Sequence, residues 1–279
     1  MIPFDFEYYK PCTIQEAIDL YRTLHADGKE PLYFCGGTEI ITMARLNQLY
    51  TQAVIDIKDI PECTVLESNA ELIEIGAAIP LAQLEEWKEF PLLSRVCNRI
   101  ADHTSRYKIT LGGNICGKIK YREAVLPLLI ADSEITVASE DGLRKLPIHK
   151  IFNKQMNLNT GEFVVQAAIP KRYAEMPYIT EKRTKIDRID YPLITMAALR
   201  DGEAIRLSFS GLCEFPFRSQ EIEKIVNDSN LHAEERARRS LNQIPAPVVE
   251  DINGSSDYRK FVFETLIIDV IRTLEGERP

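Results

Sequence analysis

Phe34-Cys35-Gly36-Gly37-Thr38-Glu39-Ile40 is the stretch that decides how the first part of this chain folds. It ends a short apolar run, 31–35, that predicts a buried strand, and it opens a stretch, 39–46, that predicts a helix. Glycines let the backbone turn sharply and approach a phosphate without an intervening β-carbon. The N–H groups at the start of the helix would point at such an anion, and the Thr38 hydroxyl would add a donor. A plain tight turn has the same composition, so this stretch alone predicts either outcome.

A second diglycine stretch, Thr110-Leu111-Gly112-Gly113-Asn114-Ile115, lies far along the chain from the first. Neither stretch has the Gly-x-Gly-x-x-Gly spacing of a Rossmann dinucleotide site, and neither ends in the Lys-Ser/Thr of a P-loop. A dinucleotide has a pyrophosphate and two ring systems, so two separate glycine loops closing on it are a plausible arrangement. The pair therefore disfavours hydrolysis of a nucleoside triphosphate, and on pattern alone it leaves a dinucleotide site and two plain turns equally open.

The remaining patterns predict three consecutive regions. Thr13 and Glu16 form a capping box before a helix that ends near Gly28, and 54–57 predicts a strand, which together indicate a small α/β unit with parallel pairing. From 62 to 170, short alternating strands flank helical stretches, which indicates an α+β region with a mixed or antiparallel sheet. Residues 177–210 predict three strands with a turn at 201–202, and 217–275 predicts helices.

Composition limits the classes of function. A formal net charge of −8 over 279 residues disfavours nucleic-acid binding, and no apolar run reaches the length of a membrane span. The first ten residues do not resemble a secretory signal, so a cytoplasmic location is expected. Six scattered cysteines include no Cys-x-x-Cys pair, and four widely spaced histidines offer no ligand pair. No metal site is expected in this chain, and redox chemistry would need an organic cofactor.

The two glycine stretches together resemble the paired FAD loops of the molybdenum-hydroxylase flavoprotein family, the FAD subunits or domains of xanthine dehydrogenase, carbon monoxide dehydrogenase and their relatives. Further matches occur in order along nearly the whole chain, and they are the segments 6–17, 132–134, 182–193 and 255–259. Within the last of these, we expect Ser256 to cap the final helix and Tyr258 to lie in the core.

The resemblance implies an α+β, two-lobed, vanillyl-alcohol-oxidase-like FAD-binding fold with a C-terminal domain of sheet plus helices. It divides the chain into an N-terminal α/β lobe (1–60), a middle α+β lobe (61–172) and a C-terminal flavoprotein domain (173–279). It implies that the cofactor is FAD. The first loop would hold the pyrophosphate and neighbouring groups through Tyr33, Phe34, Cys35, Gly36, Gly37, Thr38, Glu39 and Ile40. The second would do so through Thr110, Leu111, Gly112, Gly113 and Asn114.

Four residues outside the loops are implied by the same resemblance. Ile100 and Val164 would make apolar contacts to the cofactor, and Lys182 aligns with a basic residue close to the flavin ring, where its charge could stabilise the anionic reduced flavin. Glu123 falls at the position of an acidic cofactor contact. The family commonly has Ser-Pro-x-x-Asp there, whereas this chain has Ile119-Lys120 in place of Ser-Pro within the basic stretch 116–123. The added positive charges could pair with phosphate, pair with a partner subunit, or form a solvated helix start.

The family also implies the function. The chain is expected to be the FAD subunit of a heteromeric molybdenum hydroxylase of the xanthine dehydrogenase type, with no catalytic acid or base of its own. Electrons would arrive from a separate iron–sulfur subunit after oxidation of the substrate on a molybdopterin subunit, and would leave to NAD+ or another acceptor. Two alternatives remain open: a stand-alone flavin oxidoreductase of the same fold, and a non-catalytic scaffold that has lost FAD.

Overall fold

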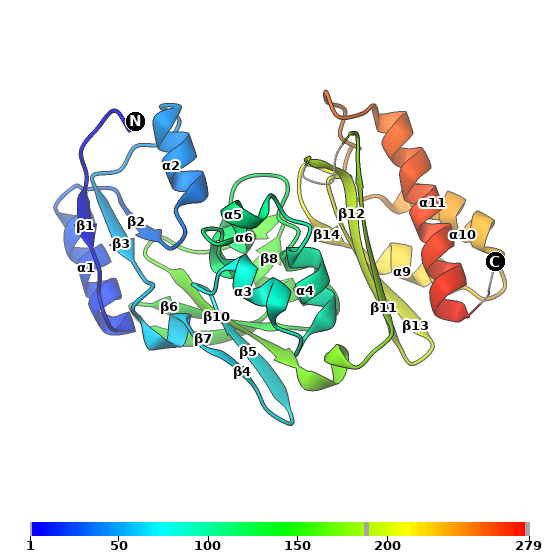
Figure 1. Ribbon diagram of the computed structural model, residues 1–279, viewed down its shortest axis with the longest axis horizontal. Helices are drawn as coiled ribbons and strands as arrows, with labels where there is room; N and C mark the ends of the chain where they lie inside the picture. Colours follow the sequence, from blue (N-terminus) through cyan, green and yellow to red (C-terminus); the bar gives the residue numbers. More distant parts are fainter. Residues whose placement is uncertain (1, 187–189, 277–279) are drawn as a thin grey trace.

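The computed structural model describes residues 2–186 and 190–276. The three larger sheets of the described residues follow one another along the long axis of the molecule, with the N-terminal lobe at one end and the C-terminal domain at the other (Figure 1). The fold is α+β, as the sequence predicts.

The N-terminal lobe is a three-stranded parallel sheet in the order β1-β3-β2. Thr13 caps the first helix by accepting a hydrogen bond from the N–H of Glu16 at 3.1 Å, and the Glu16 carboxylate accepts one from the N–H of Cys12 at 2.9 Å. Ala17 and Ile18 then bury the inner face of that helix against the sheet. The elements are β1 (Glu7–Tyr9), α1 (Ile14–Ala26), β2 (Pro31–Phe34), α2 (Thr38–Arg45) and β3 (Ala53–Asp56).

The middle lobe is built on a five-stranded sheet in the order β4-β5-β10-β6-β7, whose pairings are all antiparallel. Its strands are β4 (Leu66–Ser68), β5 (Leu72–Gly76), β6 (Glu134–Ser139), β7 (Gly142–Pro147) and β10 (Phe163–Pro170), and β8 (Phe152–Asn153) pairs with β9 (Gln155–Met156). Its helices are short: α3 (Leu81–Glu86), α4 (Pro91–Cys97), α5 (His103–Arg106), α6 (Leu111–Cys116), α7 (Val125–Ile130) and α8 (Ile148–Ile151). Single 3-10 turns occupy Pro61–Cys63 and Lys171–Ala174.

The C-terminal domain is a four-stranded antiparallel sheet with helices on one face. Along β12, Ile194 and Met196 face those helices, whereas Ala197 and Leu199 face the middle lobe, as the two-residue period of a strand requires. The elements are β11 (Tyr178–Thr184), β12 (Pro192–Asp201), β13 (Ala204–Ser210), β14 (Phe217–Arg218), α9 (Gln220–Val226), α10 (Ala233–Ser240), a 3-10 turn (Leu241–Gln243) and α11 (Ser256–Glu275).

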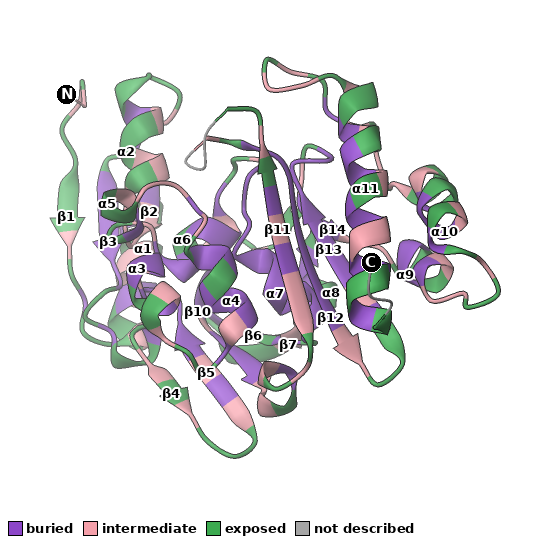
Figure 2. Cartoon of the chain, turned by 45° about the vertical axis from the view of Figure 1, so that its right-hand side comes forward, coloured by how far each residue is buried: buried purple, intermediate pink, exposed green. Residues whose placement is uncertain are grey.

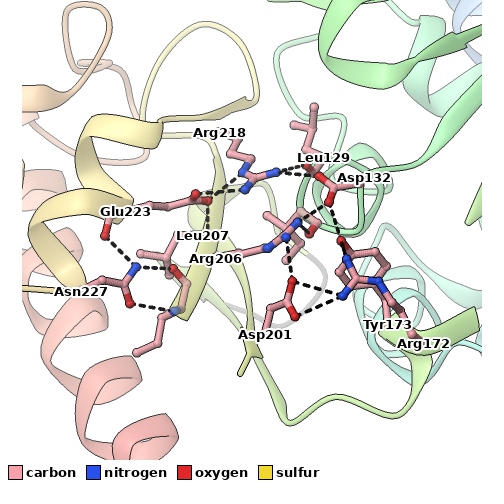
Figure 3. A network of polar contacts seen from close by, with 12 residues as sticks. Leu129, Asp132, Arg172, Tyr173, Asp201, Arg206, Leu207, Arg218, Glu223 and Asn227 are labelled. Atoms are coloured by element: carbon pink, nitrogen blue, oxygen red, sulfur yellow. Dashed lines mark hydrogen bonds and ion pairs between the residues drawn. The ribbon is translucent and has the colours of Figure 1, made fainter. Parts of the chain in front are cut away.

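Helix α7 joins the middle lobe to the C-terminal domain. All of its residues are buried (purple in Figure 2), and it packs against β12 and β13. A polar cluster reinforces this contact: the Asp132 carboxylate, directly after α7, accepts hydrogen bonds from Arg206 at 2.6 Å and from Tyr173, and Arg218 lies 3.4 Å away (Figure 3). The two units therefore share one packed interface.

Two expectations about the last helix are wrong. The N-cap of α11 is Ser255, which accepts a hydrogen bond from the N–H of Tyr258, and Ser256 is the first helical residue. Tyr258 is 51% exposed. The buried face of α11 carries Arg259, Phe263 and Leu266, and Tyr258 lies outside that face.

Candidate functional site

The first glycine segment makes the turn from β2 into α2. Gly37 caps the helix with φ +70°, in the left-handed region that glycine adopts at no steric cost. The Phe34 ring covers its Cα so closely that a β-carbon there would lie 2.2 Å from a ring atom. Within the described residues, the N–H groups of Gly36, Gly37, Thr38 and Glu39 donate no hydrogen bond to the protein. This turn therefore presents a row of free donors at the start of a helix.

The second glycine segment uses its donors internally. Thr110 caps α6, and the N–H groups of 111–114 donate to Ile79 O, Ala77 O, Thr110 Oγ1 and Thr110 O at 2.8 to 3.1 Å. A β-carbon at Gly112 would lie 2.7 Å from that of Ala77, so Gly112 permits α6 to pack tightly on the end of the middle sheet. This segment therefore supplies a closely packed wall and no free backbone donors at 111–114.

The structure brings the two segments together. A β-carbon at Gly36 would lie 1.6 Å from the carbonyl oxygen of Lys108, two residues before the second segment. After that segment, the Glu39 carboxylate accepts hydrogen bonds from the N–H groups of Lys118 at 2.8 Å and Ile119 at 3.2 Å. The N-terminal lobe and the middle lobe thus meet at the two glycine segments.

Glu123 and Lys182 form a buried pair between the middle lobe and the C-terminal domain. Their charged atoms are 3.9 Å apart and each side chain is 4% exposed. The Lys182 ammonium donates to the Arg99 carbonyl at 2.7 Å, and the Arg99 guanidinium donates back to the Lys182 carbonyl at 2.9 Å. Burial raises the pKa of Glu123 and lowers the pKa of Lys182, in each case against the attraction of the partner. The second glycine segment is tied to this pair, since Asn114 Oδ1 accepts from the N–H of Ala124 at 3.1 Å.

The other predicted site residues fall into two groups. Tyr33 packs between Tyr21 and Phe163, with ring centroids 5.1 and 4.4 Å away, and donates to Gly161 O at 3.0 Å. Cys35 is half-buried beside it, and burial raises the pKa of its thiol to about 12. Ile100, Leu111 and Val164 lie buried in the core of the middle lobe. Thr38 and Ile40 lie in the first turn of α2, where Thr38 is exposed and Ile40 is half-buried.

Three residues that sequence reasoning missed shape this region. Lys108 contacts Gly36 through its carbonyl group, Ala77 contacts Gly112 through its β-carbon and its carbonyl oxygen, and Arg99 holds Lys182 through its carbonyl. Contacts of this kind leave no pattern of residue types in the sequence. Only the tertiary structure shows that these three residues belong to the site.

Comparison with known proteins identifies the family. Residues 4–172 match the family described as the FAD binding domain in molybdopterin dehydrogenase. The chain belongs to this family. Its cofactor is therefore FAD, and the chain is a flavin-binding component of the oxidoreductases that the family comprises, the molybdenum hydroxylases.

Full-length relatives agree with this assignment. The chain is 26% identical to the glyceraldehyde dehydrogenase medium chain of Sulfolobus acidocaldarius, over 98% of this chain and 99% of that protein. It is 24% identical to the 6-hydroxypseudooxynicotine dehydrogenase complex subunit alpha of Paenarthrobacter nicotinovorans, over 100% of this chain and 98% of that protein. Carbon monoxide dehydrogenase from Hydrogenophaga pseudoflava has a chain of the same fold, with a TM-score of 0.85 at 22% identity over 96% of both chains.

Two further observations concern other kinds of site. Within residues 2–186 and 190–276, no cluster of three or more His, Cys, Asp or Glu residues could hold a metal ion. No helix in the described part of the chain is both long and apolar enough to cross a bilayer.

Proposed function

We propose that this chain is the FAD-carrying subunit of a heteromeric molybdenum hydroxylase of the xanthine dehydrogenase type. It takes electrons from an iron–sulfur subunit and passes them to NAD+ or another acceptor, while the substrate is oxidised on a molybdopterin subunit. The observation that carries the proposal is the row of free N–H donors on the first glycine segment, directly beside the second segment.

The residues present fit the cofactor. The N–H groups of Gly36 through Glu39 are unpaired within the described chain and open the eight-residue helix α2, an arrangement that favours a phosphate. A side chain at Gly36 would run into the Lys108 carbonyl and one at Gly37 into the Phe34 ring, so this turn requires glycine at both positions. We assign the pyrophosphate to these four N–H groups. The second segment forms the opposite wall, with Thr110, Gly112 and Asn114 fixing its shape.

We assign the isoalloxazine end of FAD to the side of the site that carries Glu123 and Lys182. Bound flavin supplies two-electron and one-electron redox chemistry that no side chain of this chain can provide. Lys182 is held by Arg99 and Glu123, so its ammonium keeps one position and adds positive charge near the ring without moving. Ile100, Val164 and Leu111 supply the apolar surroundings, which exclude water from this end.

We assign the supply of electrons to a separate iron–sulfur chain. This assignment is compatible with the described residues, which contain no group of His, Cys, Asp or Glu that could hold a metal. Relatives that match it from end to end are named as the medium chain or a subunit of a dehydrogenase complex. Their names support the proposal that this chain carries the flavin while other subunits carry the metal centres.

The visible absorption spectrum of the purified chain tests the FAD assignment. After incubation with FAD and desalting, we expect flavin bands near about 370 and 450 nm. They should be lost in Gly37→Val, because a branched side chain would meet the Phe34 ring and the left-handed backbone excludes it. Gly28→Val, also at positive φ but with no atom within 4 Å of its β-carbon, is the matched control and should keep the bands. A wild-type chain that retains no flavin, alone or in its complex, would contradict the assignment.

The rest of the proposal is tested on the complex purified through a tag on this chain. Co-purification of an iron–sulfur chain and a molybdopterin chain supports the subunit assignment, and their absence contradicts it. Xanthine-dependent reduction of NAD+ by that complex supports the xanthine dehydrogenase type. Turnover of a small-molecule donor by this chain alone would favour a stand-alone flavin oxidoreductase instead.

A further inference from the structure

The segment 117–122, which we call the strap, is anchored to both ends of the molecule. It follows the second glycine segment and includes most of the basic run. We propose that Lys120 and Asp251 are positioning residues that hold the strap against the C-terminal domain, and that the strap in turn holds Glu39 away from the FAD pyrophosphate. This inference rests on the assignment of the pyrophosphate to the first glycine segment.

One end of the strap holds the N-terminal lobe. The N–H groups of Lys118 and Ile119 donate to the two different carboxylate oxygens of Glu39, at 2.8 and 3.2 Å. Gly117 lies close to the same group, since a β-carbon there would be 3.0 Å from Glu39 Oε2. Glu39 is in the first turn of α2, among the free N–H donors assigned to the pyrophosphate. The strap therefore decides where this negative charge sits.

The other end of the strap holds the C-terminal domain. The Lys120 ammonium donates to Asp251 Oδ2 at 2.9 Å, and the Tyr121 hydroxyl donates to the same oxygen at 3.3 Å. Tyr121 also stacks on Tyr191, with ring centroids 4.8 Å apart. Asp251 is fixed from behind by Arg259, a fully buried residue of α11 that donates to Asp251 Oδ1 at 2.6 Å.

The middle of the strap is held by Arg122, so the contacts to Glu39 and to Asp251 belong to one hydrogen-bonded segment. The Arg122 guanidinium is buried and donates to Gly117 O at 3.1 Å, which closes the strap on itself, and it also donates to Lys154 O. The basic run is therefore tied into the protein through Lys120 and Arg122 and does not form a solvated helix start.

The consequence concerns the charge of Glu39. While Lys118 and Ile119 hold it, two hydrogen bonds from backbone N–H groups stabilise its negative charge and fix its position. If Lys120 no longer holds the strap, those donors move and the carboxylate is free to turn toward the N–H groups of its own helix start. A carboxylate there would compete with phosphate for the same donors. Loss of the Lys120–Asp251 contact should therefore weaken FAD binding, although this contact lies at the C-terminal domain and the proposed phosphate donors lie in the N-terminal lobe.

A double-mutant cycle on the full chain tests this coupling. FAD dissociation constants are measured by flavin fluorescence for wild type, Lys120→Met, Glu39→Gln and the double variant, or on the purified complex if the isolated chain does not retain FAD. Lys120→Met should weaken FAD binding about 5- to 20-fold in wild type and less than about 2-fold in Glu39→Gln, because only a charged Glu39 can compete with the phosphate. Lys120→Arg should restore wild-type affinity because it keeps the ion pair with Asp251.

The matched control is Lys171→Met, which removes a surface ion pair with Glu89 far from the strap. It should leave FAD affinity unchanged in both backgrounds. Additive effects of Lys120→Met and Glu39→Gln on a chain that binds FAD would overturn the inference and leave the FAD assignment intact. If the wild-type protein binds no FAD either as the isolated chain or in the purified complex, the proposed function itself would be overturned.

Amide hydrogen exchange supplies a readout that needs no flavin. In Lys120→Met, the N–H groups of Lys118 and Ile119 should exchange at least about 10-fold faster, because their acceptor is no longer held in place. Lys171→Met should not change them. Equal protection in Lys120→Met and wild type would show that the strap does not depend on Asp251, and the inference would be wrong.

Discussion

Gly36 and Lys108 touch through their backbones: a β-carbon at Gly36 would lie 1.6 Å from the Lys108 carbonyl oxygen and 2.7 Å from its carbonyl carbon. This contact joins the strand-to-helix turn of the N-terminal lobe to the residue that leads into the second glycine segment. The two segments can therefore form one site only while position 36 has no side chain.

Replacement of this glycine tests the contact. We expect Gly36→Ala to lower the free energy of unfolding by about 2–4 kcal/mol and to abolish FAD retention, because a backbone atom cannot yield as a flexible side chain can. Urea unfolding and flavin absorbance measure the two effects. Gly28→Ala is the control: its φ of +77° costs about 1 kcal/mol, but no atom lies within 4 Å, so FAD should remain bound. Equal losses in both variants would contradict the steric explanation.

The Glu123–Lys182 pair should show strong coupling. Glu123→Gln and Lys182→Met each leave a buried partner without its opposite charge, and each should destabilise the chain by about 3–5 kcal/mol. The double variant should lose less unfolding free energy than the sum of the losses in the two single variants, because it leaves no uncompensated charge. Chemical denaturation of the four proteins gives the interaction energy. If the losses in the two single variants add up to the loss in the double variant, Glu123 and Lys182 do not interact across their 3.9 Å separation.

The Asp132 cluster should stabilise the joint between the middle lobe and the C-terminal domain (Figure 3). Asp132→Asn keeps a residue that tolerates the φ of +47° and removes the charge that Arg206 and Arg218 contact. Because the carboxylate is 46% exposed, we expect a loss of only about 1–2 kcal/mol in urea unfolding. Asp269→Asn, equally exposed and 4.0 Å from Arg183, is the control and should cost less than about 0.5 kcal/mol.

The same variant has a defined pH dependence. Burial acts to raise the pKa of Asp132, but hydrogen bonds from Tyr173 and Arg206 outweigh it and leave the pKa below its ordinary value of 3.8. The stabilisation should therefore be complete above that ordinary value and should disappear as the pH falls through the lower value of the folded state. The stability difference between wild type and Asp132→Asn should be constant from about pH 5 to 8 and shrink in more acid solution. A difference that grows on acidification would contradict this sign.

The cysteines should differ in reactivity. Cys12 is exposed, whereas burial raises the pKa of Cys35 and Cys116 to about 12 and that of Cys213 to about 11, and also raises that of Cys63 and Cys97. Thiolate is the reactive form, so one thiol per folded chain should react quickly with Ellman's reagent and five only after denaturation. Cys12→Ser should remove the fast phase. A remaining fast phase in that variant would show that a buried thiol becomes exposed.

Local patterns predicted most of the elements because each depends on near neighbours in sequence. The capping box at Thr13, the apolar run before Gly36 and the turn at 201–202 all have short-range causes, and the structure contains each element. The error at Ser256 has a short-range cause too: Ser255 and Ser256 are equally good caps by composition. In the structure Ser255 accepts a hydrogen bond from the N–H of Tyr258, and the buried face of α11 carries Phe263 and Leu266, whereas Tyr258 lies outside it.

The sequence by itself determined that two phosphate-compatible glycine stretches, an α+β order of elements and a family resemblance occur in this chain, since residue type and spacing carry that information. Tertiary structure decided that the two stretches differ in role. The N–H groups of 111–114 donate to Ala77, Ile79 and Thr110, whereas within the described residues those of 36–39 have no acceptor in the protein. Tertiary structure also decided that the basic run 118–122 is a strap, because Asp251 and Glu39 approach it from lobes far away in sequence. Such contacts depend on how the lobes pack, and no local pattern encodes them.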